Sequence, residues 1–123
     1  MSKRTTPQRR DEGFGVPLRV GTLRQLEQAT TAAVAAPVEA ARTDVREQAV
    51  AHLDETRGRQ GGQHAWFWVA MTRWGTVFLV RMSRGGQVAR ALLGETLSGI
   101  LVTDRSSAYN WYPGRWRQVC WAH

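Results

Sequence analysis

Two apolar runs joined by a short turn constrain the fold of this chain more than any other feature. The first run, "HAWFWVAMT" (64–72), is almost continuously apolar and aromatic, and the second, "TVFLVRMS" (76–83), follows after the residues "RWG". A run without polar alternation is typical of a strand that is covered on both faces. A short glycine-containing connection between two such runs joins antiparallel strands. The runs therefore predict an antiparallel β-hairpin.

Further strands are expected on both sides of this hairpin. "AVAHLD" (49–54) and "GILVTD" (99–104) are short apolar runs, and "RWRQVCWAH" (115–123) predicts a fifth, short strand. The glycine-rich stretch "TRGRQGGQ" (56–63) carries turn signals, so we expect a loop there.

A helix is expected between the third and fourth strands, over "RGGQVARALLG" (84–94). We expect Val88, Ala91 and Leu92 on its apolar face and Gly94 as its C-terminal stop. The order β-β-β-α-β-β predicts an α/β fold with a mixed sheet, in which an antiparallel meander precedes a β-α-β unit.

The first part of the chain has a different composition. Residues 1–13 are polar and basic, so we expect a disordered basic arm. Residues 14–48 predict a helical linker, in which Thr22 is an N-cap and Pro37 lies where a second helix would start. The alternatives of two helices or one kinked helix stay open. The compact domain is expected over 49–123.

The charge of the chain favours a polyanionic partner. The formal net charge is +7, carried mostly by arginine, and the isoelectric point is near 11.2. Nucleic acid is the commonest such partner, although a genome rich in G and C also raises arginine content. Cys120 is the single cysteine, which excludes an internal disulfide. Without a signal peptide or a membrane-spanning run, we expect a cytoplasmic protein with no membrane partner.

Two aspartates occupy equivalent places at the ends of predicted strands, Asp54 after "AVAHL" and Asp104 after "GILVT". If the first and fourth strands are parallel neighbours, both carboxylates project from the same edge of the sheet. Neighbouring carboxylates repel each other unless a proton or a cation lies between them, and Mg²⁺ prefers oxygen ligands. Such ions support phosphodiester chemistry. Aspartate is also common after strands because it favours turns, so the spacing alone leaves both readings open.

Four sequence motifs occur in a fixed order: "HLDET", "AWFWVAMT", "LLGETLSGILVTDRSSAYNWYP" and "RWRQVCWAH". They closely resemble the DDE-type transposases of bacterial insertion sequences, in the insertion sequence 66 group. The resemblance covers residues 14–123 and is strongest from residue 50. It implies a partial RNase H-like fold and a site of two aspartates and one glutamate around Mg²⁺ or Mn²⁺. It also implies cutting and joining of DNA at transposon ends, association with the nucleoid, and a partner that is a second copy or a full-length transposase.

The resemblance assigns roles to individual residues. Asp54 and Asp104 match the two catalytic, metal-binding aspartates of the family. Glu55 and Thr56 complete the "DET" word as supporting residues, and by strand periodicity Glu55 points to the opposite face from Asp54. Cys120 and His123 match a C-x-x-H word of the family, and a structural role is expected, because one such pair is half a zinc site at best. The arginines expected to hold DNA phosphates are Arg57, Arg59, Arg105, Arg115 and Arg117.

The third carboxylate of the family is expected on a helix downstream of "CWAH", and no acidic residue follows Asp104 in this sequence. We therefore expect a truncated catalytic core that is inactive alone, with one sheet face open and Trp66, Trp68 or their neighbours uncovered. The alternative is a non-enzymatic remnant that binds DNA or a complete transposase. Trp111 and Tyr112 either belong to the core or stack on DNA bases.

Overall fold

The computed structural model describes residues 19–95 and 97–121. The predicted basic arm (1–13) and His123 lie outside the described residues. The chain divides into two compact units, Met1–Pro37 and Val38–His123. Helix α2, Val20–Glu47, contains Pro37, so the stretch forms one helix instead of two; Thr22 lies inside it, so its predicted role as N-cap is wrong. No helix among the described residues is long and apolar enough to span a membrane.

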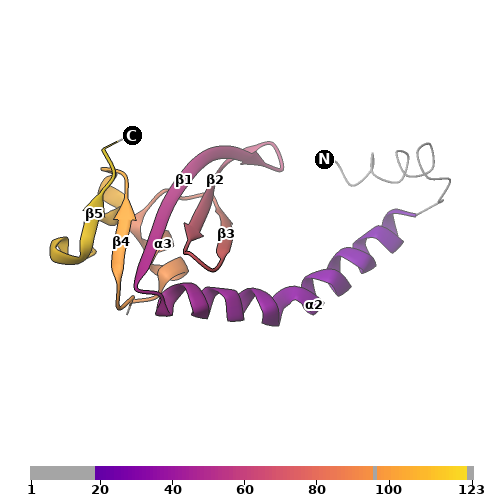
Figure 1. Ribbon diagram of the computed structural model, residues 1–123. Coiled ribbons are helices and arrows are strands. Elements are labelled where there is room, and N and C mark those ends of the chain that lie inside the picture. Colours follow the sequence, from indigo (N-terminus) through magenta and orange to yellow (C-terminus); the bar gives the residue numbers. More distant parts are fainter. Residues whose placement is uncertain (1–18, 96, 122–123) are drawn as a thin grey trace. The chain divides into compact units, whose positions relative to one another are not determined.

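The second unit contains a five-stranded mixed sheet with the strand order β3-β2-β1-β4-β5 (Figure 1). Strand β1 pairs antiparallel with β2 and parallel with β4; β2 pairs antiparallel with β3, and β4 parallel with β5. The predicted α/β class, with a meander followed by a β-α-β unit, is confirmed. The strands are β1 Val50–Gln60, β2 Gln63–Met71, β3 Thr76–Arg81, β4 Ile100–Thr103 and β5 Arg117–Val119.

Strand β1 is twice as long as the apolar run that predicted it, and the loop expected over 56–63 is wrong. The ladder between β1 and β2 continues to the pair Gln60 and Gln63. Only Gly61 and Gly62, with φ of 58° and 82°, reverse the chain. Two consecutive residues with positive φ form the turn whose twist matches that of paired strands, so the polar residues before them stay in the ladder.

Helix α3, Gly86–Leu93, connects β3 to β4 and ends at Gly94, as predicted. Ala91 is exposed, so its predicted place on the apolar face is wrong. Arg46 of α2 stabilises the helix end: its Nε donates to Leu92 O at 3.2 Å and its Nη2 to Ala91 O at 3.1 Å. These bonds satisfy carbonyls that a helix C-terminus leaves without partners. The buried side chains of α3 are Val88, Ala89, Leu92 and Leu93.

The core lies between α3 and one face of the sheet. Trp68 is fully buried there, and its indole N–H donates to Ser83 O at 3.2 Å. Pairing the N–H removes the cost of burying a polar atom inside an apolar cluster. The sheet residues of this cluster are Ala51, Leu53, Trp68, Ala70, Val77, Leu79 and Leu101.

The opposite face of the sheet is open and partly apolar. Phe78 is 68% exposed, and Phe67 and Met71 are about 40% exposed. The uncovered side chains are thus neighbours of the tryptophans, since Trp68 is buried and Trp66 is half-buried. The fifth strand is shorter than predicted, because Gly114–Trp116 form the 3₁₀ turn η2 before β5.

Candidate metal centre and nucleic-acid interface

Asp54 and Asp104 lie at the same edge of the sheet, beside the end of β4. His52 of β1 is paired with Val102 of β4, and each aspartate is two residues further along its chain. Strand β4 ends at Thr103, whereas β1 continues beside β2. Both aspartates therefore lie where β4 has ended and β1 continues. They line a hollow of about 170 Å³ together with His52, Leu53, Met71, Val102, Thr103 and Cys120.

Each aspartate is held by a local backbone hydrogen bond. Asp54 Oδ1 accepts from the N–H of Glu55 at 2.9 Å, and Asp104 Oδ1 accepts from the N–H of Ser106 at 2.8 Å. Within the described part of the chain Asp54 forms no ion pair, and Asp104 Oδ2 lies 3.8 Å from Arg84 Nη2. The two carboxylates therefore keep oxygen atoms that a cation can use.

Glu55 points away from the hollow, into the covered face of the sheet. Its Oε1 accepts from Arg84 Nε at 2.7 Å, and its Oε2 accepts from the hydroxyl of Tyr109. A buried carboxylate is costly unless it is paired and hydrogen-bonded, and here both conditions are met. The hydrogen bond to Glu55 raises the pKa of Arg84, and burial, followed by the bond to Glu55, raises the pKa of Tyr109.

Arg117 of β5 holds the loop that follows β4. Its Nε donates to Thr103 Oγ1 at 3.0 Å, and its Nη2 donates to Asp104 O at 2.9 Å and Ser106 O at 3.3 Å. Its Nη1 donates to Asn110 Oδ1 at 3.0 Å. These bonds fix the backbone on both sides of Asp104, so the donors of Arg117 are used within the chain.

The comparison with known families gives one match. A family model described as "Transposase IS66 family" matches residues 4–123. The chain belongs to the IS66 family of transposases. No curated protein and no solved structure matches it.

The other predicted DNA-contact arginines of this IS66-family chain are exposed. Arg57 lies over the ring of Trp66 at 5.4 Å, and Arg105 lies over that of Trp121 at 5.7 Å. Stacking on an indole limits the motion of a guanidinium. Arg59, on the β1 extension, and Arg115, in η2, are exposed as well.

The remaining predicted residues divide between the hollow and the surface. Cys120 lines the hollow, and its backbone N–H donates to Thr103 O at 2.7 Å. Thr56 is exposed on β1, opposite Phe67. Within residues 19–95 and 97–121, no group of three or more His, Cys, Asp or Glu side chains could hold a metal ion.

Sequence reasoning missed the partners of Glu55. Strand periodicity places Glu55 on the same face as the buried Leu53, and a carboxylate in that position requires a cation and a donor nearby. This pattern indicates that Glu55 has partners, but it does not identify them. The contacts to Arg84 and Tyr109 span 29 and 54 residues of sequence, so only the folded structure identifies them.

Proposed function

We propose that Asp54 and Asp104 are the two aspartate ligands of a Mg²⁺ or Mn²⁺ site in the RNase H-like catalytic core of a DDE transposase. The observation that carries this proposal is that both side chains, from neighbouring parallel strands, line one hollow. Membership of the IS66 family supports the reaction class. The mixed sheet, with a meander on one side of β1 and a parallel β-α-β partner on the other, supports the RNase H-like assignment.

The residues present fit a hard divalent cation in part. Two carboxylates supply oxygen ligands, and Asp54 has no competing cation among the described residues. When bound, such an ion would activate an attacking oxygen and stabilise a leaving one at a phosphodiester. The chain's own residues orient the ligands: Ser106 and Arg117 fix the backbone around Asp104. Glu55 anchors β1 on the covered face through Arg84.

The proposed substrate is the DNA at transposon ends, which a complete family member would hydrolyse and join to a target on the nucleoid. Exposed arginines supply phosphate contacts, and arginine suits phosphate because its planar fork donates two parallel hydrogen bonds. Arg57, Arg59, Arg105 and Arg115 are in this position, whereas Arg117 acts on the loop of Asp104. The described residues bring together two carboxylates, not three, so we expect negligible DNA cleavage by these 123 residues alone.

Manganese binding tests the site directly. The purified chain is titrated with Mn²⁺, and free ion is measured by electron paramagnetic resonance. Asp54→Asn and Asp104→Asn should each weaken binding at least about tenfold, because each removes a charged oxygen ligand. Asp44→Asn is the matched control, since Asp44 is an exposed aspartate on α2 that accepts a hydrogen bond from Gln48. Equal binding by the three variants and the parent chain would reject the site.

A second candidate function is non-enzymatic: binding of DNA, or of a complete transposase, without catalysis. The open sheet face favours it, because exposed apolar patches mark interaction surfaces. DNA binding that is unchanged by EDTA and by Asp54→Asn would support this reading. Cleavage of terminal-repeat DNA by the chain, abolished by either aspartate substitution, would exclude it.

A further inference from the structure

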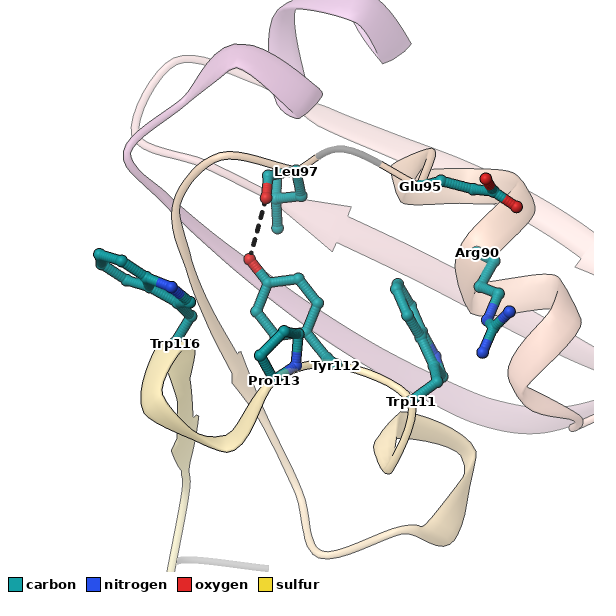
Figure 2. Close-up of a pocket in the computed structure, with 7 residues that line it drawn as sticks. All are labelled: Arg90, Glu95, Leu97, Trp111, Tyr112, Pro113 and Trp116. Atoms are coloured by element: carbon teal, nitrogen blue, oxygen red, sulfur yellow. Dashed lines mark hydrogen bonds between the residues drawn. The ribbon is translucent and has the colours of Figure 1, made fainter.

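A second hollow, of about 350 Å³, lies at the other end of β4 from the two aspartates. Leu97, on its wall, precedes β4, whereas Asp104 follows it, and a four-residue strand spans about 13 Å. The volume is in the range of small-molecule sites. The lining side chains are Arg90, Glu95, Leu97, Trp111, Tyr112, Pro113 and Trp116 (Figure 2).

Tyr112 is a fixed part of this hollow. It is buried, and its hydroxyl donates to Leu97 O at 3.2 Å and to Gly99 O. Its ring meets that of Trp111 edge to face, with centroids 5.5 Å apart. Tyr112 therefore belongs to the core, and stacking on a ligand is left to the other two aromatic rings.

Trp111 and Trp116 lie on either side of Tyr112 and Pro113 (Figure 2). Trp116 is 47% exposed, which leaves ring surface open to a planar ligand. Trp111 is half-buried, and its indole N–H has no acceptor in the described part of the chain.

The charges around the hollow narrow the chemistry of the ligand. The guanidinium of Arg90 lies 5.1 Å from the centre of the Trp111 ring, and exposed Arg115 is adjacent to Trp116. Both favour a ligand that carries phosphate. Glu95 also lines the hollow and disfavours an anion inside it. A nucleotide whose neutral base lies inside the hollow avoids repulsion from Glu95, and its phosphate can then pair with Arg90 and Arg115.

We propose that this hollow, which Trp111 also lines, binds an unpaired base of single-stranded DNA stacked on Trp116, with Arg90 at the adjacent phosphate. Stacking on aromatic side chains is the usual way in which proteins hold unpaired bases, and it accepts any base. This site adds to the proposed function, because it places a contact to a DNA strand at the opposite end of β4 from the two aspartates. It requires DNA as the partner but no metal, so it can be tested separately.

The test uses fluorescence anisotropy of labelled oligothymidylate and of an abasic strand of equal length, in EDTA. We expect tighter binding of thymidylate. Trp116→Ala should weaken thymidylate binding roughly 5- to 100-fold and leave the abasic strand unchanged, and Trp116→Phe should retain most of the affinity. Arg90→Gln should weaken both strands and lower the salt slope by about one.

The matched control is Trp74→Ala. Trp74 is 71% exposed and carries Arg73 over its ring at 4.8 Å, so it is a comparable indole and arginine pair at a different place. It should bind both strands as the parent chain does, and because the assay runs in EDTA, this result does not depend on the proposed metal site. Equal affinity for the two strands, no binding at low salt, or the same loss in Trp74→Ala as in Trp116→Ala would overturn the inference.

Discussion

Arg84 Nε lies 2.7 Å from Glu55 Oε1, and this ion pair joins an exposed cation to a buried anion. The side chain of Glu55 has no exposure, whereas that of Arg84 is 47% exposed. The same guanidinium reaches to 3.8 Å from Asp104 Oδ2. Arg84, three residues after the end of β3, is thereby linked to the middle of β1 and, more weakly, to the loop after β4. These are the elements that carry the two aspartates.

Removing Arg84 should destabilise the fold, because it leaves the carboxylate of Glu55 buried with only the hydroxyl of Tyr109. Breaking a fully buried pair costs roughly 3–5 kcal/mol. Arg84 is half-exposed, and solvent screens its charge, so we expect about 1–3 kcal/mol for Arg84→Ala. Urea unfolding measures the loss.

Arg57→Ala is the control for this prediction. Arg57 and Arg84 both lie over the ring of Trp66, at 5.4 and 4.8 Å, but of the two only Arg84 contacts Glu55. We expect Arg57→Ala to change the free energy of unfolding by less than about 0.5 kcal/mol. Equal losses in the two variants would mean that ring stacking, not the ion pair, stabilises this region.

The two tyrosines of the chain should resist ionisation while it is folded. Burial raises the pKa of both Tyr109 and Tyr112, and the hydrogen bond to Glu55 raises that of Tyr109 further. Unfolded tyrosines ionise near pH 10. Above that pH the unfolded state therefore binds fewer protons than the folded state, and stability falls as pH rises. Absorbance at a tyrosinate wavelength should stay flat through about pH 10 and rise only with unfolding.

Tyr109→Phe separates the contribution of Tyr109 to the alkaline loss of stability from that of Tyr112. It should remove part of the alkaline loss of stability and should cost about 1–3 kcal/mol at neutral pH, since Glu55 loses a donor. Urea midpoints between neutral and alkaline pH give both quantities. Tyrosinate absorbance that appears near pH 10 in the folded chain would contradict the burial of these side chains.

The sequence predicts the parts of this fold that depend on local pattern. Apolar runs locate strands β1 to β4. Asp54 is expected at the end of its strand but lies within β1, and it comes level with Asp104 because β1 and β4 are parallel with His52 paired to Val102. The local sequence pattern fails to predict a strand where backbone pairing with a neighbouring strand outweighs the polar composition of the segment. The polar residues before Gly61 look like a loop, yet they form strand because β2 offers backbone partners opposite them.

The side chains that support the candidate site are harder to predict from the sequence than the two aspartates themselves. Arg117 is one of several arginines that suggest DNA phosphate contacts, and only its position beside β4 shows that its donors bind the loop of Asp104. Tyr109 likewise lies within the family motif "SAYNW", but its contact with Glu55 depends on a 3₁₀ turn, Ser107–Tyr109, that packs against α3. Long-range side-chain contacts of this kind follow from the fold and not from periodicity.

The turn between β1 and β2 should respond differently at its two glycines. Gly61 and Gly62 both have positive φ, which asparagine tolerates and alanine does not. Gly62→Ala should cost about 1 kcal/mol, and Gly61→Asn should be nearly neutral because Asn-Gly is a favoured pair in such turns. Thermal unfolding of both variants measures the difference. An alanine as well tolerated as the asparagine would mean that the polar extension of β1 is not paired as described.

The open face of the sheet should govern aggregation, and the covered face should govern stability. Phe78 and Leu79 are neighbours on β3, yet Phe78 is 68% exposed and Leu79 only 8%. Phe78→Thr introduces a β-branched residue that suits a strand and removes exposed apolar surface, so it should slow aggregation and change the free energy of unfolding by less than about 0.5 kcal/mol. Leu79→Ala removes buried methyl groups and should cost about 2–4 kcal/mol. Light scattering of concentrated samples and urea unfolding measure the two effects separately. If Phe78→Thr were as destabilising as Leu79→Ala, another part of the protein would have to cover the face that carries Phe78.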